Sequence, residues 1–184
     1  MDESFLTDYE TAIYTDDRES TCFFTGHRSI EGRILPSLAR LLKANIAYLY
    51  SDVGVRTFCA GGALGFDTLA AYTVYDLRRS IPDLRLVLEL PFHGQETLWT
   101  AQQQRTYRLM LSFADEVRYT VDTLPDDKRE TARRYLLARD RRLIADGAYC
   151  ITYFGGKRGG TAYTVAHAES AGCTIINLFN ELKH

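Results

Sequence analysis

The stretch that decides the fold is VRTFCAGGALGFDTLAAYTVYDLRR, residues 55–79. Its first six residues, 55–60, form a short apolar run, which predicts a buried strand. Gly61 and Gly62 end this run, and residues 67–79 then show the apolar spacing of an amphipathic helix. A strand that passes through a glycine loop into a helix is the repeating unit of a parallel α/β sheet.

The same order of elements repeats along the chain. Further strands are predicted where apolar runs occur, at 21–25, 84–90, 116–120, 148–154 and 173–179. Helices are predicted between them, at 34–50, 96–114, 126–146 and 161–171. Because the strands are continuously apolar, helices should cover both faces of their sheet. The sequence therefore predicts an α/β fold class, a three-layer Rossmann-like fold with a mainly parallel sheet, in one domain over residues 21–184. Residues 1–20 read as an acidic N-terminal lead-in.

Composition restricts the classes of protein and site. The chain has 184 residues and a net charge of −2, so nucleic-acid binding would need a local basic patch. No apolar stretch approaches the roughly 18 residues of a membrane span, and the acidic N-terminus is unlike a signal peptide. We therefore expect a cytoplasmic protein with no membrane partner. The four histidines show no metal-ligand spacing, so no metal site is predicted. The cysteines form no CxxC pair and should be buried free thiols; they are Cys22, Cys59, Cys150 and Cys173.

Glycines concentrate where the predicted strands end. Nine of the 13 glycines lie in loops that leave a strand, at positions 26, 61, 62, 65, 94, 155, 156, 159 and 160. Ligands of such a sheet bind beyond the carboxyl ends of its strands. The clustering therefore indicates that backbone is brought close to a ligand at this edge.

The first two of these loops supply polar candidates for nucleotide binding. The first loop offers Thr25, Gly26, His27 and Arg28, suited to phosphate or ribose, although a plain turn with a surface arginine would look the same. The second loop offers Gly61, Gly62, Gly65 and Asp67. It opens a helix, whose exposed N–H groups and positive end favour an anion. Asp67 would bind ribose hydroxyls or, alternatively, only cap the helix.

Two later loops complete the predicted cleft. After residues 84–90 come the candidates Pro91, Phe92, Gln95 and Trp99. We expect Pro91 to end its strand and Trp99 to lie one turn into the next helix, where it would stack on a base or instead anchor the core. The last loop, GGKRGGT, offers Gly155, Gly156, Gly159, Gly160 and Thr161 around two cations. Glycine N–H groups beside Lys157 and Arg158 are suited to an anion.

The helix predicted at 126–146 is the most basic segment of the chain. Residues 128–142 contain one lysine and six arginines against two acids. Asp140 lies four residues from both Leu136 and Ile144, which places a carboxylate in the apolar stripe of the helix. A charge in that position needs a partner. The neighbouring Arg139 makes Arg139–Asp140 a candidate pair for the site.

Four of these motifs occur together in a known superfamily. The segments GGALGFDTLAA (61–71), PFHGQETLW (91–99), RDRRLIAD (139–146) and YFGGKRGGTAYTVAHAESAGCTIINL (153–178) resemble the SLOG superfamily, in particular its YpsA-like branch. The resemblance covers about residues 20–180. It implies a nucleotide-derived ligand at the strand ends, such as NAD, ADP-ribose or a nucleoside monophosphate, no secure enzymatic activity, and a homodimer.

More distant relatives suggest two alternatives to a nucleotide-binding sensor. The Lonely Guy type phosphoribohydrolases, which resemble the last loop, act with a glutamate in the motif PGGxGTxxE; Thr164 stands at that position here. A hydrolase of the nucleotide N-glycosidic bond would then have to use Asp67, Asp140 or Arg139. The DNA-processing protein DprA is similar over 61–71 and 139–146, which implies single-stranded nucleic-acid binding, although the net charge of −2 speaks against it.

Overall fold

The computed structural model describes residues 17–122 and 130–182. One sheet contains six parallel strands in the order β4-β3-β2-β1-β5-β6. The strands are β1 Thr21–Gly26, β2 Thr57–Ala60, β3 Arg85–Phe92, β4 Glu116–Val121, β5 Tyr149–Tyr153 and β6 Thr174–Asn177. The chain builds outward from β1 to β4 and then returns to place β5 on the other side of β1. The strand order thus reverses between β1 and β5, which is where such sheets open a ligand crevice.

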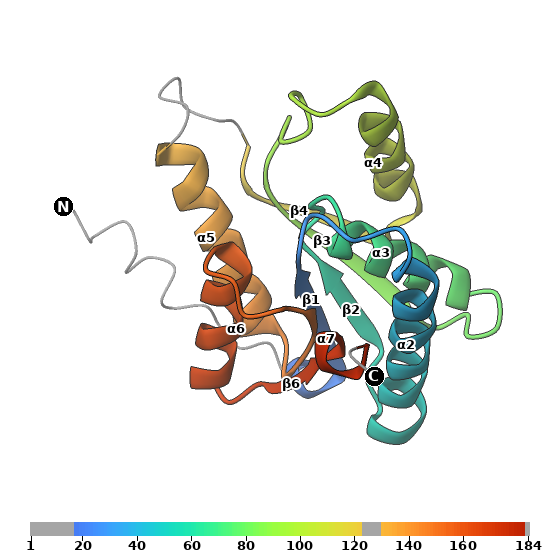
Figure 1. Cartoon of the computed structure of the whole chain (residues 1–184). Helices are drawn as coiled ribbons and strands as arrows, with labels where there is room; N and C mark the ends of the chain where they lie inside the picture. The colour runs from blue at the N-terminus through green and yellow to red at the C-terminus, as the bar shows by residue number, and fades with distance from the viewer. Residues whose placement is uncertain (1–16, 123–129, 183–184) are drawn as a thin grey trace.

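Helices cover both faces of the sheet (Figure 1), which confirms the predicted three-layer α/β fold. One face carries α2 Leu35–Tyr48, α3 Phe66–Leu77, α4 Ala101–Phe113 and the short α7 Leu178–Glu181. The other face carries α5 Glu130–Asp146 and α6 Gly160–Ser170. A 3-10 turn, Arg18–Ser20, precedes β1, and a π-helical turn, Leu49–Val53, extends α2. Within the described residues, no helix combines the length and the apolar character that a membrane crossing requires.

The core has two layers because successive strand residues point to opposite faces of the sheet. Phe24 and Phe58 lie on the side of α2 and α3, where their rings stack with centroids 5.9 Å apart. Phe23 and Val87 lie on the side of α5 and α6. All four cysteines are buried and unpaired, as predicted.

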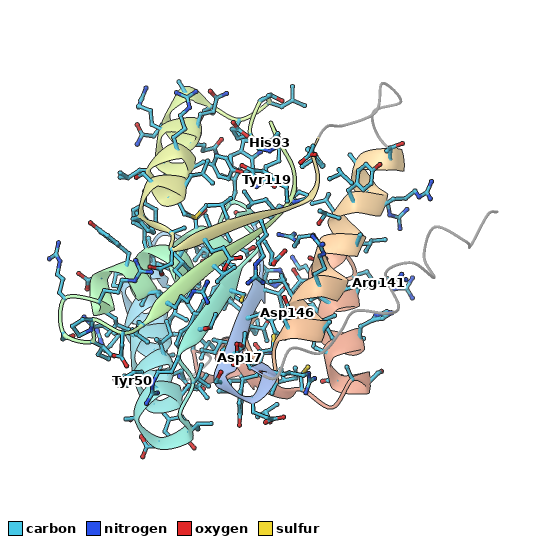
Figure 2. The ribbon with its side chains drawn as sticks, turned by 180° about the vertical axis from the view of Figure 1, so that it is seen from behind. Asp17, Tyr50, His93, Tyr119, Arg141 and Asp146 are labelled. Atoms are coloured by element: carbon cyan, nitrogen blue, oxygen red, sulfur yellow. The ribbon has the colours of Figure 1, made fainter. Side chains whose placement is uncertain are left out.

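An ion cluster fastens α5 to the outer strands of the sheet. Arg118 of β4 lies 3.1 Å from Glu89 of β3 and 3.3 Å from Asp146. Asp146 is the last residue of α5 (Figure 2). Glu89 is only 1% exposed, and a carboxylate so deeply buried needs such a partner. The cluster therefore fixes the position of α5 over the sheet, and with it the side chains that α5 brings to the strand ends.

Pro91 does not end its strand, contrary to the prediction. β3 continues through Phe92, and Phe92 still pairs with Val121 of β4. Pairing with β2 stops earlier, at Leu88. Beyond Leu88 one side of β3 is therefore free of a ladder partner, and a residue without an N–H is tolerated at such an edge.

The start of α4 and the end of the last strand also differ from the prediction. α4 begins at Ala101, not at 96, because Thr100 caps it: the Thr100 hydroxyl accepts from the N–H of Gln103, whose side chain accepts from the N–H of Thr100. Trp99 therefore precedes the helix. The last strand ends at Asn177 because the Asn177 side chain accepts from the N–H of Phe179 and starts α7. Part of the predicted helix 126–146, residues 126–129, lies outside the described residues, as do residues 1–16 of the predicted lead-in.

Candidate functional site

A cavity of about 660 Å³ opens at the carboxyl ends of β1 and β5. This volume is within the range of small-molecule sites. The walls come from the end of β1, the loop between β2 and α3, the inner face of α5 and the start of α6. The cavity therefore lies at the point where the strand order reverses.

The buried floor of the cavity is an ion network centred on Arg139, which is 6% exposed. Its Nε lies 2.8 Å from Oδ1 of Asp140, and its Nη1 lies 3.9 Å from Oδ2 of Asp67. Nη1 also donates a hydrogen bond to the carbonyl of Gly61. The prediction that Asp140 needs a partner in the apolar stripe is thus confirmed, and the same arginine connects α5 to the loop after β2.

One guanidinium in this network faces two carboxylates. Burial raises the pKa of the Asp67 carboxyl to about 6, with the nearby Asp140 adding to the rise and Arg139 opposing it. The N–H of Ala63 donates a hydrogen bond of 3.4 Å to Oδ2 of Asp67. Asp67 is therefore a carboxyl that takes up a proton at mildly acidic pH, at a position facing the cavity.

Gly61 makes this network possible because it leaves room for the arginine. A Cβ at Gly61 would overlap Nη1 of Arg139 and would lie 2.8 Å from Oδ2 of Asp67. The absence of a side chain at Gly61 therefore lets the side chain of Arg139 lie close to the backbone after β2. The glycine pattern of the sequence predicts, in addition, the approach of a ligand to the backbone at this loop.

Thr164 completes the floor from α6. Its hydroxyl donates a hydrogen bond to Oδ2 of Asp140 at 3.0 Å, and the carbonyl of Gly160 lies at the same distance. Thr164 is 1% exposed. Thr164 stands at the position where the Lonely Guy type hydrolases carry a glutamate. Here its hydroxyl binds the carboxylate of Asp140 on the neighbouring helix α5.

The cavity has a strongly cationic rim. Arg28, Arg133, Lys157 and Arg158 are all exposed and line the cavity. Together with Arg139 they make five cationic side chains against two lining carboxylates, a formal surplus of three positive charges in a chain whose net charge is −2. This local surplus favours an anion.

Two helix starts at this edge add backbone donors. α3 begins after Gly65 and α6 after Gly159, and neither start has a side-chain cap. The first N–H groups of a helix have no partner within it, and the helix dipole makes that end positive. The hydroxyl of Thr161 donates to the carbonyl of Gly26 at 3.0 Å, so the start of α6 is fixed against the end of β1.

His27 anchors the glycine loop before α6. Its Nε2 accepts a hydrogen bond of 2.8 Å from the N–H of Gly155. That bond requires a neutral ring with its proton on Nδ1. Burial, followed by the nearby Lys157, lowers the pKa of His27, which favours the neutral form. His27 therefore has a structural role in addition to its place on the cavity wall.

The structure divides the predicted cleft into two cavities. The first brings together the candidates Thr25, Gly26, His27, Arg28, Asp67, Arg139, Asp140, Gly159, Gly160 and Thr161. A second, of about 530 Å³, contains Trp99 and Gly65, and Arg28 again. Neither cavity is lined by the remaining candidates, Gly61, Gly62, Pro91, Phe92, Gln95, Gly155 and Gly156.

Several of the remaining candidates have structural contacts of their own. Pro91 and Phe92 are buried in β3. The side chain of Gln95 donates to the hydroxyl of Tyr107 at 3.1 Å and to the carbonyl of Gly62 at 3.3 Å. The neighbouring His93 stacks on Tyr119 of β4, with ring centroids 3.5 Å apart (Figure 2).

The two cations of the predicted glycine loop, Lys157 and Arg158, line the cavity. Several other residues of the cavity were not among the predicted ones; they are Phe24 and Ala63, then Arg133, Leu136, Leu137 and Leu143 of α5, and Tyr163 and Thr164 of α6. The α5 residues recur at spacings of three and four with Asp140, so they share one helix face, which was readable from the sequence. Within the described residues, no group of three potential metal-ligating side chains occurs.

The chain is similar to several known proteins. The family model described as the YspA SLOG family matches residues 22–170. The uncharacterised SPbeta prophage-derived protein YoqJ of Bacillus subtilis is 27% identical over 143 residues, which cover 73% of this chain and 83% of YoqJ. A UPF0398 protein of Staphylococcus haemolyticus is 35% identical over 101 residues, 52% of this chain and 54% of that protein.

Two solved structures share the fold. DprA of Streptococcus pneumoniae has a TM-score of 0.58 at 15% identity, over 84% of this chain and 48% of that chain. DprA of Helicobacter pylori, whose structure describes a single-stranded DNA binding mode, has a TM-score of 0.57 at 15% identity, over 86% of this chain and 65% of that chain. The chain thus spans about half the length of the S. pneumoniae protein.

Proposed function

The chain belongs to the YspA SLOG family, and on that premise we propose that its strand-end cavity binds the phosphate-bearing part of a nucleotide or nucleotide derivative. The observation that carries the proposal is the surplus of three positive charges around a cavity of nucleotide size. The charge of the whole chain has the opposite sign, so the surplus is a property of this site. We propose a binding or sensing role for the site, without catalysis.

In the proposed complex the phosphate lies at the start of α6. The N–H groups of Gly160 and Thr161 would donate to it, with Lys157 and Arg158 beside them. Charge-assisted bonds of this kind are among the stronger hydrogen bonds in proteins. The glycine loop suits this role because it presents backbone donors without side chains in the way.

The rest of the nucleotide finds matching chemistry deeper in the cavity. Leu136, Leu137 and Tyr163 offer an apolar wall for a base or sugar ring. The carboxyl of Asp67 is the candidate acceptor for a ribose hydroxyl, because it faces the cavity. The first loop contributes Arg28 to the rim.

Calorimetric titration of the folded protein with AMP, ADP-ribose and NAD tests the proposal. Binding should weaken at least about tenfold in the double variant Lys157→Ala/Arg158→Ala, since each cation would lose a charge-assisted bond. Arg40→Ala is the matched control: Arg40 is an exposed cation of α2 that lines neither cavity, so affinity should stay unchanged. Absence of heat with all three nucleotides at millimolar concentration would count against the site.

An enzyme is the second candidate, because two carboxyls and an arginine meet at the floor of the cavity. It would hydrolyse the N-glycosidic bond of a nucleotide. Release of free base from AMP or NAD, abolished in Asp67→Asn or Asp140→Asn while binding persists, would support it. Binding of the nucleotide without release of free base would support the sensing role instead.

Single-stranded nucleic acid is the third candidate, supported by the fold shared with DprA and by the basic rim of the cavity. Because a strand would neutralise several cations at once, its affinity should fall steeply with salt concentration. An anisotropy titration with labelled oligothymidylate at several salt concentrations separates this candidate from a mononucleotide site.

A further inference from the structure

The second cavity lies next to the first and shares one residue with it. Its volume is about 530 Å³, and it opens between the start of α2, α3 and α4. Arg28 lines both cavities. A cation at a shared wall can hold a linking group whose two ends extend into different cavities.

The loop that carries Arg28 is held firmly against the loop after β2. The N–H of Phe66 donates to the carbonyl of His27 at 3.1 Å. Gly65 has a φ of +80°, and a Cβ there would lie 2.5 Å from the backbone of Arg28. The side chain of Arg28 itself is exposed, so a fixed backbone presents its guanidinium at the wall that the two cavities share.

Trp99 gives the second cavity a rigid aromatic wall. Its ring meets that of Tyr107 edge to face, with centroids 5.4 Å apart. Its backbone N–H donates to the carbonyl of Glu96 at 2.9 Å, and its carbonyl accepts from the side chain of Gln104 at 3.1 Å. The hydroxyl of the neighbouring Tyr72 donates to the carbonyl of Thr106 at 3.0 Å, which fixes a second aromatic ring of the lining. Such preorganised rings are suited to stacking on a planar ligand.

The charge of the lining indicates what kind of group fits. Arg28 is the only charged residue among those that line the second cavity; the others are apolar or uncharged, such as Leu64, Leu69 and Gln102. The cationic surface of the first cavity therefore stops at Arg28. This distribution matches a ligand whose negative charge lies between two uncharged rings, and it offers no cationic path for a longer phosphate chain.

We propose that the ligand of this protein is a dinucleotide-type molecule, two ring systems joined through a pyrophosphate that reaches from the start of α6 to Arg28, with the second ring in the Trp99 cavity. The inference rests on the proposed function, because the first nucleotide occupies the strand-end cavity. It adds the ligand class and a second site of recognition.

The test uses Trp99 itself, because it is the only tryptophan of the chain and its fluorescence reports on the second cavity alone. Full-length protein is titrated with AMP, ADP-ribose, NAD and diadenosine pyrophosphate, by calorimetry and by tryptophan emission in parallel. AMP and ADP-ribose should bind without changing the emission. NAD or diadenosine pyrophosphate should bind at least about tenfold more tightly than AMP and quench the emission, since a stacked ring adds roughly this much affinity.

A pair of neighbouring variants isolates the ring contact. Trp99→Ala should remove the added affinity for the two-ring ligands and leave the affinity for AMP unchanged. Leu98→Ala should change neither, because Leu98 is 97% exposed and lines neither cavity. Circular dichroism verifies that both variants fold, and the emission of the wild-type protein provides a result that depends on no variant.

The possible failures are distinguishable. If none of the four ligands binds, the proposed function itself is refuted. If AMP binds but the two-ring ligands gain no affinity and leave the emission unchanged, the second site is refuted and the first survives. If a ten-nucleotide oligothymidylate binds more tightly than all four ligands, with an affinity that falls steeply with salt concentration, the dinucleotide proposal is refuted in favour of a nucleic-acid strand.

Discussion

Replacing Gly61 by alanine should disrupt the buried ion network at the floor of the cavity. A Cβ at this position would overlap Nη1 of Arg139 and lie 2.8 Å from Oδ2 of Asp67. The backbone of Gly61 does not have a positive φ, so an alanine is not excluded by its own conformation. The whole effect must then come from displacing Arg139, which is 6% exposed and pairs with Asp140 at 2.8 Å.

The expected size follows from what the displaced guanidinium leaves behind. Breaking a buried ion pair while its carboxylates stay buried costs about 3–5 kcal/mol. For a domain of this length each kcal/mol lowers Tm by about 2–4 °C, so Gly61→Ala should lower Tm by roughly 6–20 °C. Urea unfolding gives the free energy, and Gly32→Ala is the matched control because a Cβ at Gly32 has nothing within 4 Å.

A double-mutant cycle with Arg139→Met tests the cause as well as the size. If the clash with the guanidinium is responsible, Gly61→Ala should cost at least about 2 kcal/mol less in the Arg139→Met background than in the wild type. Equal costs in the two backgrounds would refute the reasoning, because the effect would then not pass through Arg139. A Tm within about 2 °C of the wild type would refute it too, since a buried pair cannot be displaced so cheaply.

Three further predictions concern the same edge of the sheet. Asp67 has a folded pKa of about 6, against 3.8 for an unperturbed carboxyl. Its stabilising contribution is therefore complete below pH 3.8 and is lost as the pH rises through 6. Asp67→Asn should remove this part of the pH dependence of the unfolding free energy. His27 has a lowered pKa, so its contribution is complete above about pH 6.5 and is lost as the pH falls below it. His27→Ala should flatten that limb of the curve, and an unchanged limb would exclude the bond to Gly155 as its cause. Thr164→Val should lower the unfolding free energy in urea by about 1–3 kcal/mol because it leaves the buried Asp140 without its hydroxyl donor, whereas a neutral result would mean that the hydroxyl serves only the Gly160 carbonyl.

The parts of the fold that depend on local pattern were predictable from the sequence. The apolar runs gave six strands because strands buried on both faces need no alternation. The same reasoning identified Asp140 as a charge in an apolar stripe, and the structure supplies the expected partner, Arg139. The start of α4 was readable as well: Thr100 and Gln103 have the spacing of a capping box, a stronger signal than the apolar pattern that placed the helix start at residue 96.

Other features depend on contacts between distant segments and carry no local signal. Pro91 remains in a strand only because β2 stops pairing with β3 at Leu88, which no sequence window reveals. The division of the predicted cleft into two cavities depends on where the side chain of Arg28 lies relative to two other loops. The contact at Gly61 carries no local signal for the same reason, since the group that occupies the space next to its backbone is Arg139, 78 residues away in the chain.

The geometry around Thr164 bears on whether the site is a sensor or a hydrolase. A carboxylate that stabilises a cationic transition state must present to the reacting atoms an oxygen that protein donors do not already occupy. In Asp140 one oxygen lies 2.8 Å from Arg139 and the other accepts from Thr164 at 3.0 Å, and the residue is 8% exposed. Asp67 is less constrained, with an Arg139 contact at 3.9 Å, but its raised pKa weakens it as an anion below neutral pH. If catalysis occurs here, it therefore depends on Asp67 and should increase as the pH rises through 6; base release that is unaffected by Asp67→Asn would require another group in the cavity.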